Sequence, residues 1–170
     1  MFDIRSVNFE SAEHLLYLWC ETFKQAYKDV HTSENIHAYC ANNFTLDAAV
    51  DVLSDDKTVC CIAYQDNQPS GYYIVKHHDC PIDLQQSASE LKQIYILASQ
   101  YGLGLGRALF EHASSIIQNA GREGIWLCVS DINYRAQSFY KKLTFTPVGP
   151  GPVFDVGTDR LSSTVMVSWL

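Results

Sequence analysis

Three alternating glycines stand in the run Gln100-Tyr101-Gly102-Leu103-Gly104-Leu105-Gly106-Arg107-Ala108-Leu109. The residues before it, 91–97, are mostly apolar and rich in β-branched and aromatic side chains, which predicts a strand. After it, apolar residues recur every three or four positions as far as Ala120, which predicts a helix. Gly121 follows where a left-handed helix cap is expected. The glycines therefore occupy a tight turn from a strand into a helix.

A turn of this kind predicts an anion site. The first N–H groups of the helix have no partners within it, and the helix dipole is positive at that end. Glycines let a phosphate or pyrophosphate approach the backbone. Close packing of the helix on the strand would also require glycines, so the pattern alone leaves both interpretations open. The run lacks Gly-Lys-Ser/Thr, which excludes a P-loop. Arg107 stands where a dinucleotide fingerprint has its third glycine.

The composition predicts one folded domain, residues 1–170. Apolar residues make up 47% of the chain, which argues against disorder. The net charge of −7 disfavours a nucleic-acid partner and is compatible with cationic small molecules. No segment resembles a signal peptide or a membrane span, so we expect a cytoplasmic protein with no membrane partner.

The cysteines predict neither a disulfide framework nor a metal site. The six of them include no Cys-x-x-Cys spacing, so we expect mostly buried, reduced thiols. Cys60 and Cys61 are adjacent on a predicted strand and should face opposite sides. The run 77–80, His-His-Asp-Cys, has the residue types of a metal site, but neighbouring strand residues do not readily converge on one ion. We expect no metal.

The same patterns place the other elements along the chain. Ser11 and Ser33 are candidate N-caps of two helices, the first reaching Val30. A polar loop is expected at 77–89 and a helix at 133–142. The remaining predictions are strands at 2–7, 58–65, 72–76, 124–129, 145–148, 153–156 and 164–169, a short helix at 46–53 and a turn at 66–71.

This order resembles the GNAT superfamily of acyl-CoA-dependent N-acetyltransferases, and two motifs carry the resemblance. The family's Arg/Gln-x-x-Gly-x-Gly/Ala falls on residues 101–106. Its Asn-x-x-Ala-x-x-Phe-Tyr-x-x-x-Gly-Phe is similar to residues 133–145, NYRAQSFYKKLTF. The resemblance implies a single α/β (α+β) domain with a central mixed, mostly antiparallel sheet flanked by helices. A splayed pair of parallel strands would hold the cofactor.

Two positions depart from the family pattern. Tyr101 stands where Arg or Gln is usual, so the resemblance carries over the backbone cradle but not that side-chain contact. Thr144 replaces the glycine after the second motif's helix. If its backbone is still left-handed, the strain costs about 1 kcal/mol.

The resemblance implies acetyl-CoA as co-substrate and no metal. Its pantetheine would pair with the backbone near Ile94 and Ile96, and its pyrophosphate with the amides of 102–107. Arg107 is either a further charge for the cofactor or an exposed helix arginine, and Asn133 is an N-cap, a pantetheine contact or both. The implied cofactor-binding residues are Ile94, Tyr95, Ile96, Tyr101, Gly102, Leu103, Gly104, Leu105, Gly106, Arg107 and Asn133.

Two residues match the family's catalytic positions. Tyr140 would protonate the departing thiolate, whereas its position on an apolar stripe also suits a core tyrosine. Glu90 would remove the proton of the attacking amine, directly or through water, or is a solvated glutamate at the strand edge. The resemblance implies direct attack on the thioester, with the oxyanion meeting a backbone N–H near Ile96.

The tail, residues 149–170 with Phe154-x-x-Gly157-x-Asp159, also resembles small bacterial diamine and polyamine acetyltransferases. The expected acceptor is therefore a small primary amine, polyamines included. An amino acid, an antibiotic or a protein N-terminus are alternative acceptors. A non-catalytic acyl-CoA sensor is the alternative outside enzymes, and a homodimer is left open.

Overall fold

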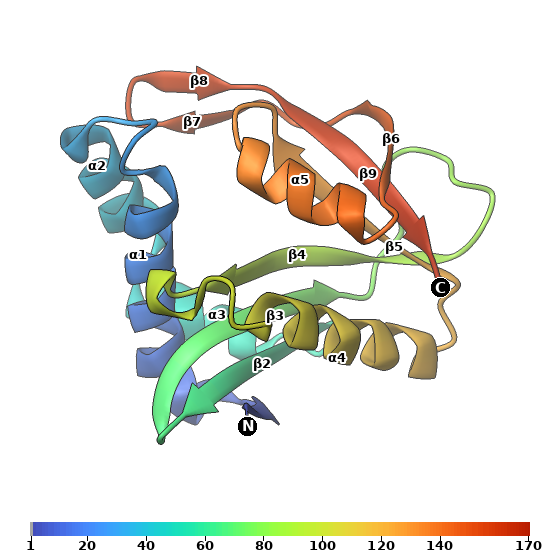
Figure 1. Cartoon of the computed structure of the whole chain (residues 1–170), viewed down its shortest axis with the longest axis horizontal. Coiled ribbons are helices and arrows are strands. Elements are labelled where there is room, and N and C mark those ends of the chain that lie inside the picture. Colours follow the sequence, from blue (N-terminus) through green and yellow to red (C-terminus); the bar gives the residue numbers. More distant parts are fainter. Residues whose placement is uncertain (1) are drawn as a thin grey trace.

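The computed structural model describes residues 2–170, so Met1 of the predicted domain lies outside the described residues. Within 2–170, seven strands form one sheet in the order β1-β2-β3-β4-β5-β9-β6, and β7 pairs with β8 (Figure 1). All neighbours in the sheet are antiparallel except β4 and β5, which confirms the predicted α/β class with its mixed sheet. The elements are β1 (Asp3–Ser6), α1 (Ala12–Tyr27), α2 (Ser33–Asn43), α3 (Leu46–Ser54), β2 (Thr58–Gln65), β3 (Gln68–Lys76), β4 (Ala88–Ile96), α4 (Leu105–Asn119), β5 (Gly124–Ser130), α5 (Tyr134–Lys142), β6 (Thr146–Pro150), β7 (Phe154–Val156), β8 (Asp159–Leu161) and β9 (Ser163–Trp169).

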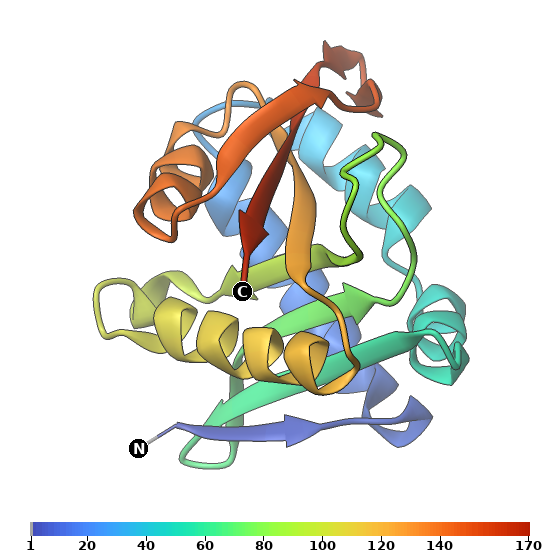
Figure 2. The ribbon, with the colours of Figure 1, turned by 90° about the vertical axis from the view of Figure 1, so that its right-hand side faces the viewer.

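The sheet is buried on both faces. Successive strand residues point to opposite sides, so Cys61 and Tyr73 pack under α4, whereas Cys60 and Tyr72 pack against α1 and α3. The prediction for Cys60 and Cys61 is thus confirmed, and all six cysteines are free thiols. Figures 1 and 2 show α4 and α5 on one side of the sheet and the α1–α3 group on the other.

The predicted turn at 66–71 was too long. The hairpin turns at Asp66 and Asn67, whose φ angles are +50° and +59°, and β3 begins at Gln68. Gly71 lies inside the strand rather than in the turn. A Cβ there would stand 2.8 Å from the Ile96 side chain, so this glycine permits close packing of β3 on β4.

The predicted C-terminal cap of α4 is confirmed, whereas the two predicted N-caps, Ser11 and Ser33, are wrong. Gly121 has the predicted left-handed φ, +75°, after α4. Ser11 makes no capping hydrogen bond, because Asn8 caps a short 3₁₀ turn just before α1. Thr32, not Ser33, caps α2 by accepting the Asn35 N–H at 3.2 Å. None of the helices in residues 2–170 has the length and apolarity that a membrane crossing requires.

Candidate active site

The site begins where β4 and β5 separate. Their pairing covers only Ala88–Glu90 and Gly124–Trp126. Beyond it, α4 and α5 lie on the same face of the sheet and flank β4 in the view of Figure 1. The Leu97 N–H donates to the Ser70 carbonyl of β3 at 2.9 Å. Because backbone groups alternate in direction along a strand, those of Ile94 and Ile96 face the open edge. The splayed pair of parallel strands is as predicted.

A cavity of about 400 Å³ lies between β4, the glycine turn and α5. It brings together nine of the eleven residues predicted to bind the cofactor: Ile94, Tyr95, Ile96, Tyr101, Gly102, Gly104, Gly106, Arg107 and Asn133. Leu103 and Leu105 do not line it. Leu103 is exposed on the turn, and Leu105 is fully buried in the core with the other apolar residues of α4. We call this space the turn cavity.

The glycines of the turn serve its backbone conformation. Gly102 and Gly104 have φ angles of +79° and +86°, which L side chains rarely adopt. A Cβ at either position would meet no other atom within 4 Å, so close packing does not explain these two glycines. The space above them is open, and the first N–H groups of α4 lie beside it. The geometry therefore suits an anion at the helix N-terminus.

Two polar residues of the turn cavity were not predicted. Gln100 is 9% exposed, and its Oε1 has no hydrogen-bond partner within residues 2–170. Arg135 places its guanidinium carbon 3.5 Å from the centre of the Tyr101 ring, a cation–π contact. Arg107 also lines the cavity while donating to Glu111 at 2.8 Å. Arg135 lies between Asn133 and Ala136 of the second motif. Its position inside that motif is the sequence feature from which its place in the cavity could have been predicted.

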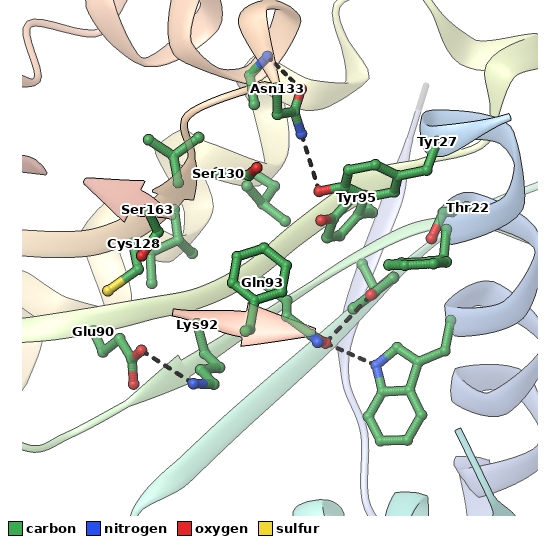
Figure 3. Close-up of a pocket in the computed structure, with 18 of the residues that line it drawn as sticks. Thr22, Tyr27, Glu90, Lys92, Gln93, Tyr95, Cys128, Ser130, Asn133 and Ser163 are labelled. Atoms are coloured by element: carbon green, nitrogen blue, oxygen red, sulfur yellow. Dashed lines mark hydrogen bonds and ion pairs between the residues drawn. The ribbon is translucent and has the colours of Figure 1, made fainter. Parts of the chain in front are cut away.

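A second cavity, of about 290 Å³, lies between α1, α2, β4 and β5 (Figure 3). We call it the acceptor cavity. Nine of its 22 lining residues are aromatic, and Phe154 of β7 contributes to the wall. Among the described residues that line it, Glu90 is the only carboxylate and Lys92 the only cation.

Glu90 lies in the wall of the acceptor cavity. β4 begins two residues before it, and Glu90 is 5% exposed, so the solvated strand-edge alternative was wrong. One of its carboxylate oxygens pairs with Nε2 of His78 at 2.6 Å. The other lies 3.5 Å from Nζ of Lys92, as Figure 3 shows. Burial, and to a smaller extent the Glu90 charge, raises the pKa of the Cys128 thiol in the same wall.

Tyr140 lines both cavities, as do Ile94, Tyr95, Asn133 and Ala136. Its ring packs edge-on against Phe139 and tilted against Phe145, with centroids 5.5 Å apart in each pair. Burial, with a smaller contribution from Tyr27, raises the pKa of Tyr140 above its ordinary value. The phenol therefore stays protonated through neutral pH and is able to donate a proton.

Asn133 joins the two sides of the site. Its Oδ1 accepts the Ala136 N–H at 3.1 Å and caps α5, which confirms the N-cap interpretation. Its Nδ2 donates to the hydroxyl of Tyr27 on α1 at 3.3 Å (Figure 3). The hydrogen bond links α1 to α5 where the two cavities meet.

The tail motif Phe154-x-x-Gly157-x-Asp159 forms the β7–β8 hairpin, of which β8 was not predicted. Gly157 has a φ of +59°, and a Cβ there would stand 2.2 Å from Oδ1 of Asn35 on α2. Asp159 accepts from Nδ2 of Asn35 at 3.1 Å and pairs with Nδ1 of His31 at 2.6 Å. Of the three named motif residues, Phe154 alone lines the acceptor cavity. Gly157 and Asp159 instead hold the hairpin against α2 and against His31 in the segment before it.

The run 77–80 does not converge on one point. His77 bonds the Ser89 hydroxyl at 3.0 Å, and Asp79 accepts from Arg122 at 2.7 Å, whereas His78 faces Glu90. Over residues 2–170, no group of three or more His, Cys, Asp or Glu residues is arranged to hold a metal ion.

Comparison with known proteins gives both a family match and similar folds. A sequence model of the acetyltransferase (GNAT) family matches residues 13–145. An uncharacterized N-acetyltransferase of Mycobacterium tuberculosis is 26% identical over 156 residues, which cover 92% of this chain and 96% of the relative. An uncharacterized N-acetyltransferase of Mycobacterium bovis matches to the same extent.

Solved structures of N-acetyltransferases are similar over the whole chain. The PaiA N-acetyltransferase of Thermoplasma acidophilum, solved in complex with coenzyme A, has a TM-score of 0.80 at 20% identity, covering 100% of this chain and 99% of that one. A GCN5-related N-acetyltransferase from Rhodopseudomonas palustris has a TM-score of 0.79 at 17% identity, covering 99% and 95%. At these identities the likeness concerns the fold.

Proposed function

Because the chain belongs to the acetyltransferase (GNAT) family and is an N-acetyltransferase, we propose that it moves an acetyl group from acetyl-CoA to a small primary amine. The observation that carries the proposal is the junction of the two cavities. Both are lined by Ile94, Tyr95, Asn133, Ala136 and Tyr140. A donor in one cavity and an amine in the other would therefore meet at Tyr140.

The turn cavity fits coenzyme A. The backbone groups of Ile94 and Ile96 at the open edge of β4 would pair with pantetheine amides, and the amides of the glycine turn would hold the pyrophosphate. The unpartnered Oε1 of Gln100 offers an acceptor to an N–H or O–H of the ligand. Arg107 and Arg135 supply positive charge along the same wall. When bound, the cofactor supplies the acetyl thioester.

Glu90 is proposed to remove the ammonium proton of the acceptor. An alkyl amine has a pKa of about 10, so it is mostly protonated at neutral pH and cannot attack until the proton leaves. The Glu90 carboxylate lines the acceptor cavity and contacts His78, whose side chain is 47% exposed. The proton would pass from the amine to Glu90, directly or through water, and on through His78 to solvent.

Tyr140 is proposed to give its proton to the leaving sulfur. Its raised pKa keeps the phenol neutral, so the proton is present when the thiolate forms. We propose direct attack without an acyl-enzyme. Cys128 is the only cysteine among the described residues lining either cavity, and its raised pKa makes it a poor nucleophile.

Diamines and polyamines are one candidate class of acceptor, motivated by the tail resemblance. The alternative outside enzymatic acetylation is an acyl-CoA sensor. The test is a thiol-release assay of purified protein with acetyl-CoA and a panel of amines, beside calorimetry of acetyl-CoA binding. Saturable binding with amine-dependent thiol release supports the proposal. Saturable binding without turnover of any amine would favour the sensor.

A further inference from the structure

We infer that the acceptor is a primary amine carrying one aromatic ring, an arylalkylamine, rather than a polyamine. This inference rests on the proposed function and specifies its acceptor. It comes from four features of the acceptor cavity: the arrangement of its rings, its size, its balance of charge and one oriented amide.

The rings of the wall form one packed surface. Phe23 stacks on Tyr39 with centroids 4.4 Å apart and planes 8° apart, and Trp19 stacks on Phe44 at 5.3 Å. Phe23 and Phe44 meet edge to face at 5.6 Å, so the two stacks are continuous. An aromatic guest gains more from such a wall than its buried area alone provides, because ring pairs have favourable stacked and edge-on geometries.

The size of the acceptor cavity also fits one ring. Apolar cavities of about 150 Å³ hold benzene. The acceptor cavity, at about 290 Å³, has room for a ring and a short aminoalkyl chain that reaches the junction at Tyr140.

The charges of the cavity fit one ammonium group. Glu90 already contacts His78 and Lys92. In Figure 3 the Glu90–Lys92 pair lies at one end of the acceptor cavity, and Tyr27 and Thr22 lie at the other end. A polyamine keeps at least one further ammonium after its reacting nitrogen is deprotonated. Among the described lining residues there is no second carboxylate to receive it, and the Lys92 ammonium would repel it. A monoamine needs no such partner.

Gln93 provides a polar contact beside the rings. The indole N–H of Trp19 is only a donor, so the group that faces it at 2.8 Å is the Gln93 carbonyl oxygen. The Tyr72 hydroxyl donates to the same oxygen at 3.3 Å. The two donors occupy the amide oxygen, so the NH₂ group is the part of the Gln93 side chain left for a ligand in the cavity that Gln93 lines. A ring bearing a hydroxyl, as in tyramine, would accept from it.

The test compares five amines: phenethylamine, tyramine, 2-cyclohexylethylamine, putrescine and spermidine. We expect kcat/KM for phenethylamine to exceed that for its saturated analogue by about threefold to tenfold, the range of an aromatic pair. Both aryl amines should exceed the diamine and spermidine by about tenfold or more. Equal rates for the saturated analogue, or a preference for spermidine, would overturn the inference.

Matched variants separate the cavity from general stability. Phe44→Leu removes a half-buried ring of the acceptor wall, and Phe110→Leu removes a half-buried ring that packs on Phe145 outside both cavities. The first should lower kcat/KM for aryl amines by about fivefold. The second should leave it unchanged, and both should retain acetyl-CoA affinity. An equal effect of the two variants counts against the inference.

Binding keeps the inference testable if acetylation itself fails. Phenethylamine is titrated calorimetrically into protein saturated with coenzyme A. Saturable binding that Phe44→Leu weakens supports the aryl site even when no thiol is released, in which case the proposed reaction alone fails. The inference is rejected if phenethylamine does not bind while spermidine binds saturably, or if no amine binds.

Discussion

The proton donor is best tested by removing one oxygen atom, with Tyr140→Phe. The proposed general acid typically contributes about 10²–10⁴ in rate, or about 2.7–5.4 kcal/mol of barrier at about 1.36 kcal/mol per tenfold. We expect kcat to fall by that factor. KM for acetyl-CoA should stay within about twofold, because the sulfur carries developing charge only in the transition state.

The same variant should fold normally. The ring of Tyr140 packs on Phe139 and Phe145, and a phenylalanine keeps both contacts. The free energy of unfolding should therefore change by less than about 0.5 kcal/mol. Tyr17→Phe is the control, since Tyr17 is half exposed on α1 and lines neither cavity. It should leave kcat within about twofold.

The assay is single-turnover thiol release, which reports the chemical step even if product release limits kcat. Measured against pH, the unmodified protein should show no loss from phenol ionisation below about pH 10, the ordinary pKa of tyrosine, because the folded pKa of Tyr140 lies higher. A single-turnover rate for Tyr140→Phe equal to that of Tyr17→Phe would remove Tyr140 from the mechanism.

Three further outcomes are expected. Glu90→Gln should lower kcat/KM by about 10²-fold at neutral pH, and kcat/KM of the variant should recover towards about pH 10, where amines lose their own proton. A pH profile of thiol release equal to that of the unmodified protein would exclude Glu90 as the base. Gly104→Glu should weaken coenzyme A binding in calorimetry by about tenfold or more. Gly121→Glu is the control, because Gly121 also has a positive φ and open space but follows the other end of α4; both variants should lose about 1 kcal/mol of stability, and the control should keep its affinity for coenzyme A. Equal affinities of the two variants would reject the turn as the anion site. Gly157→Ala should lower the free energy of unfolding by about 1–3 kcal/mol beyond the effect of Gly102→Ala, because only the former Cβ collides, with Asn35; equal melting curves would refute this.

Local chemistry made the turn and the second motif predictable. Left-handed backbone at Gly121 follows from helix capping, and Asn133 caps α5 as its side chain suggests. Thr144 has a φ of +67°, so this chain keeps the left-handed backbone where its residue departs from the family glycine. Its hydroxyl lies 3.1 Å from that of Ser168, a contact that glycine would not make.

Features that depend on distant contacts were missed. Gly71 looked like a turn residue because the approach of Ile96, 25 positions away, leaves no trace near it in the sequence. For Glu90 the sequence left a base and a solvated edge residue as alternatives, because the burial that decides between them depends on His78 and the neighbouring strand β5. The tail suggested substrate recognition, yet Gly157 is explained by its fit against Asn35.

The separation of β4 from β5 connects the fold to the proposed chemistry. A sheet edge inside a protein leaves N–H and C=O groups unpaired, which is costly when water is excluded. At Ile94 and Ile96 those groups face the turn cavity, where the proposed pantetheine would pair with them as a further strand. The ligand would then continue the hydrogen-bond ladder of β4 beyond the point, at Trp126, where its pairing with β5 ends. The Asn133–Tyr27 hydrogen bond joins α5 to α1 where the two cavities meet. The proposed donor and the proposed acceptor would therefore meet at this junction, beside the opening between β4 and β5.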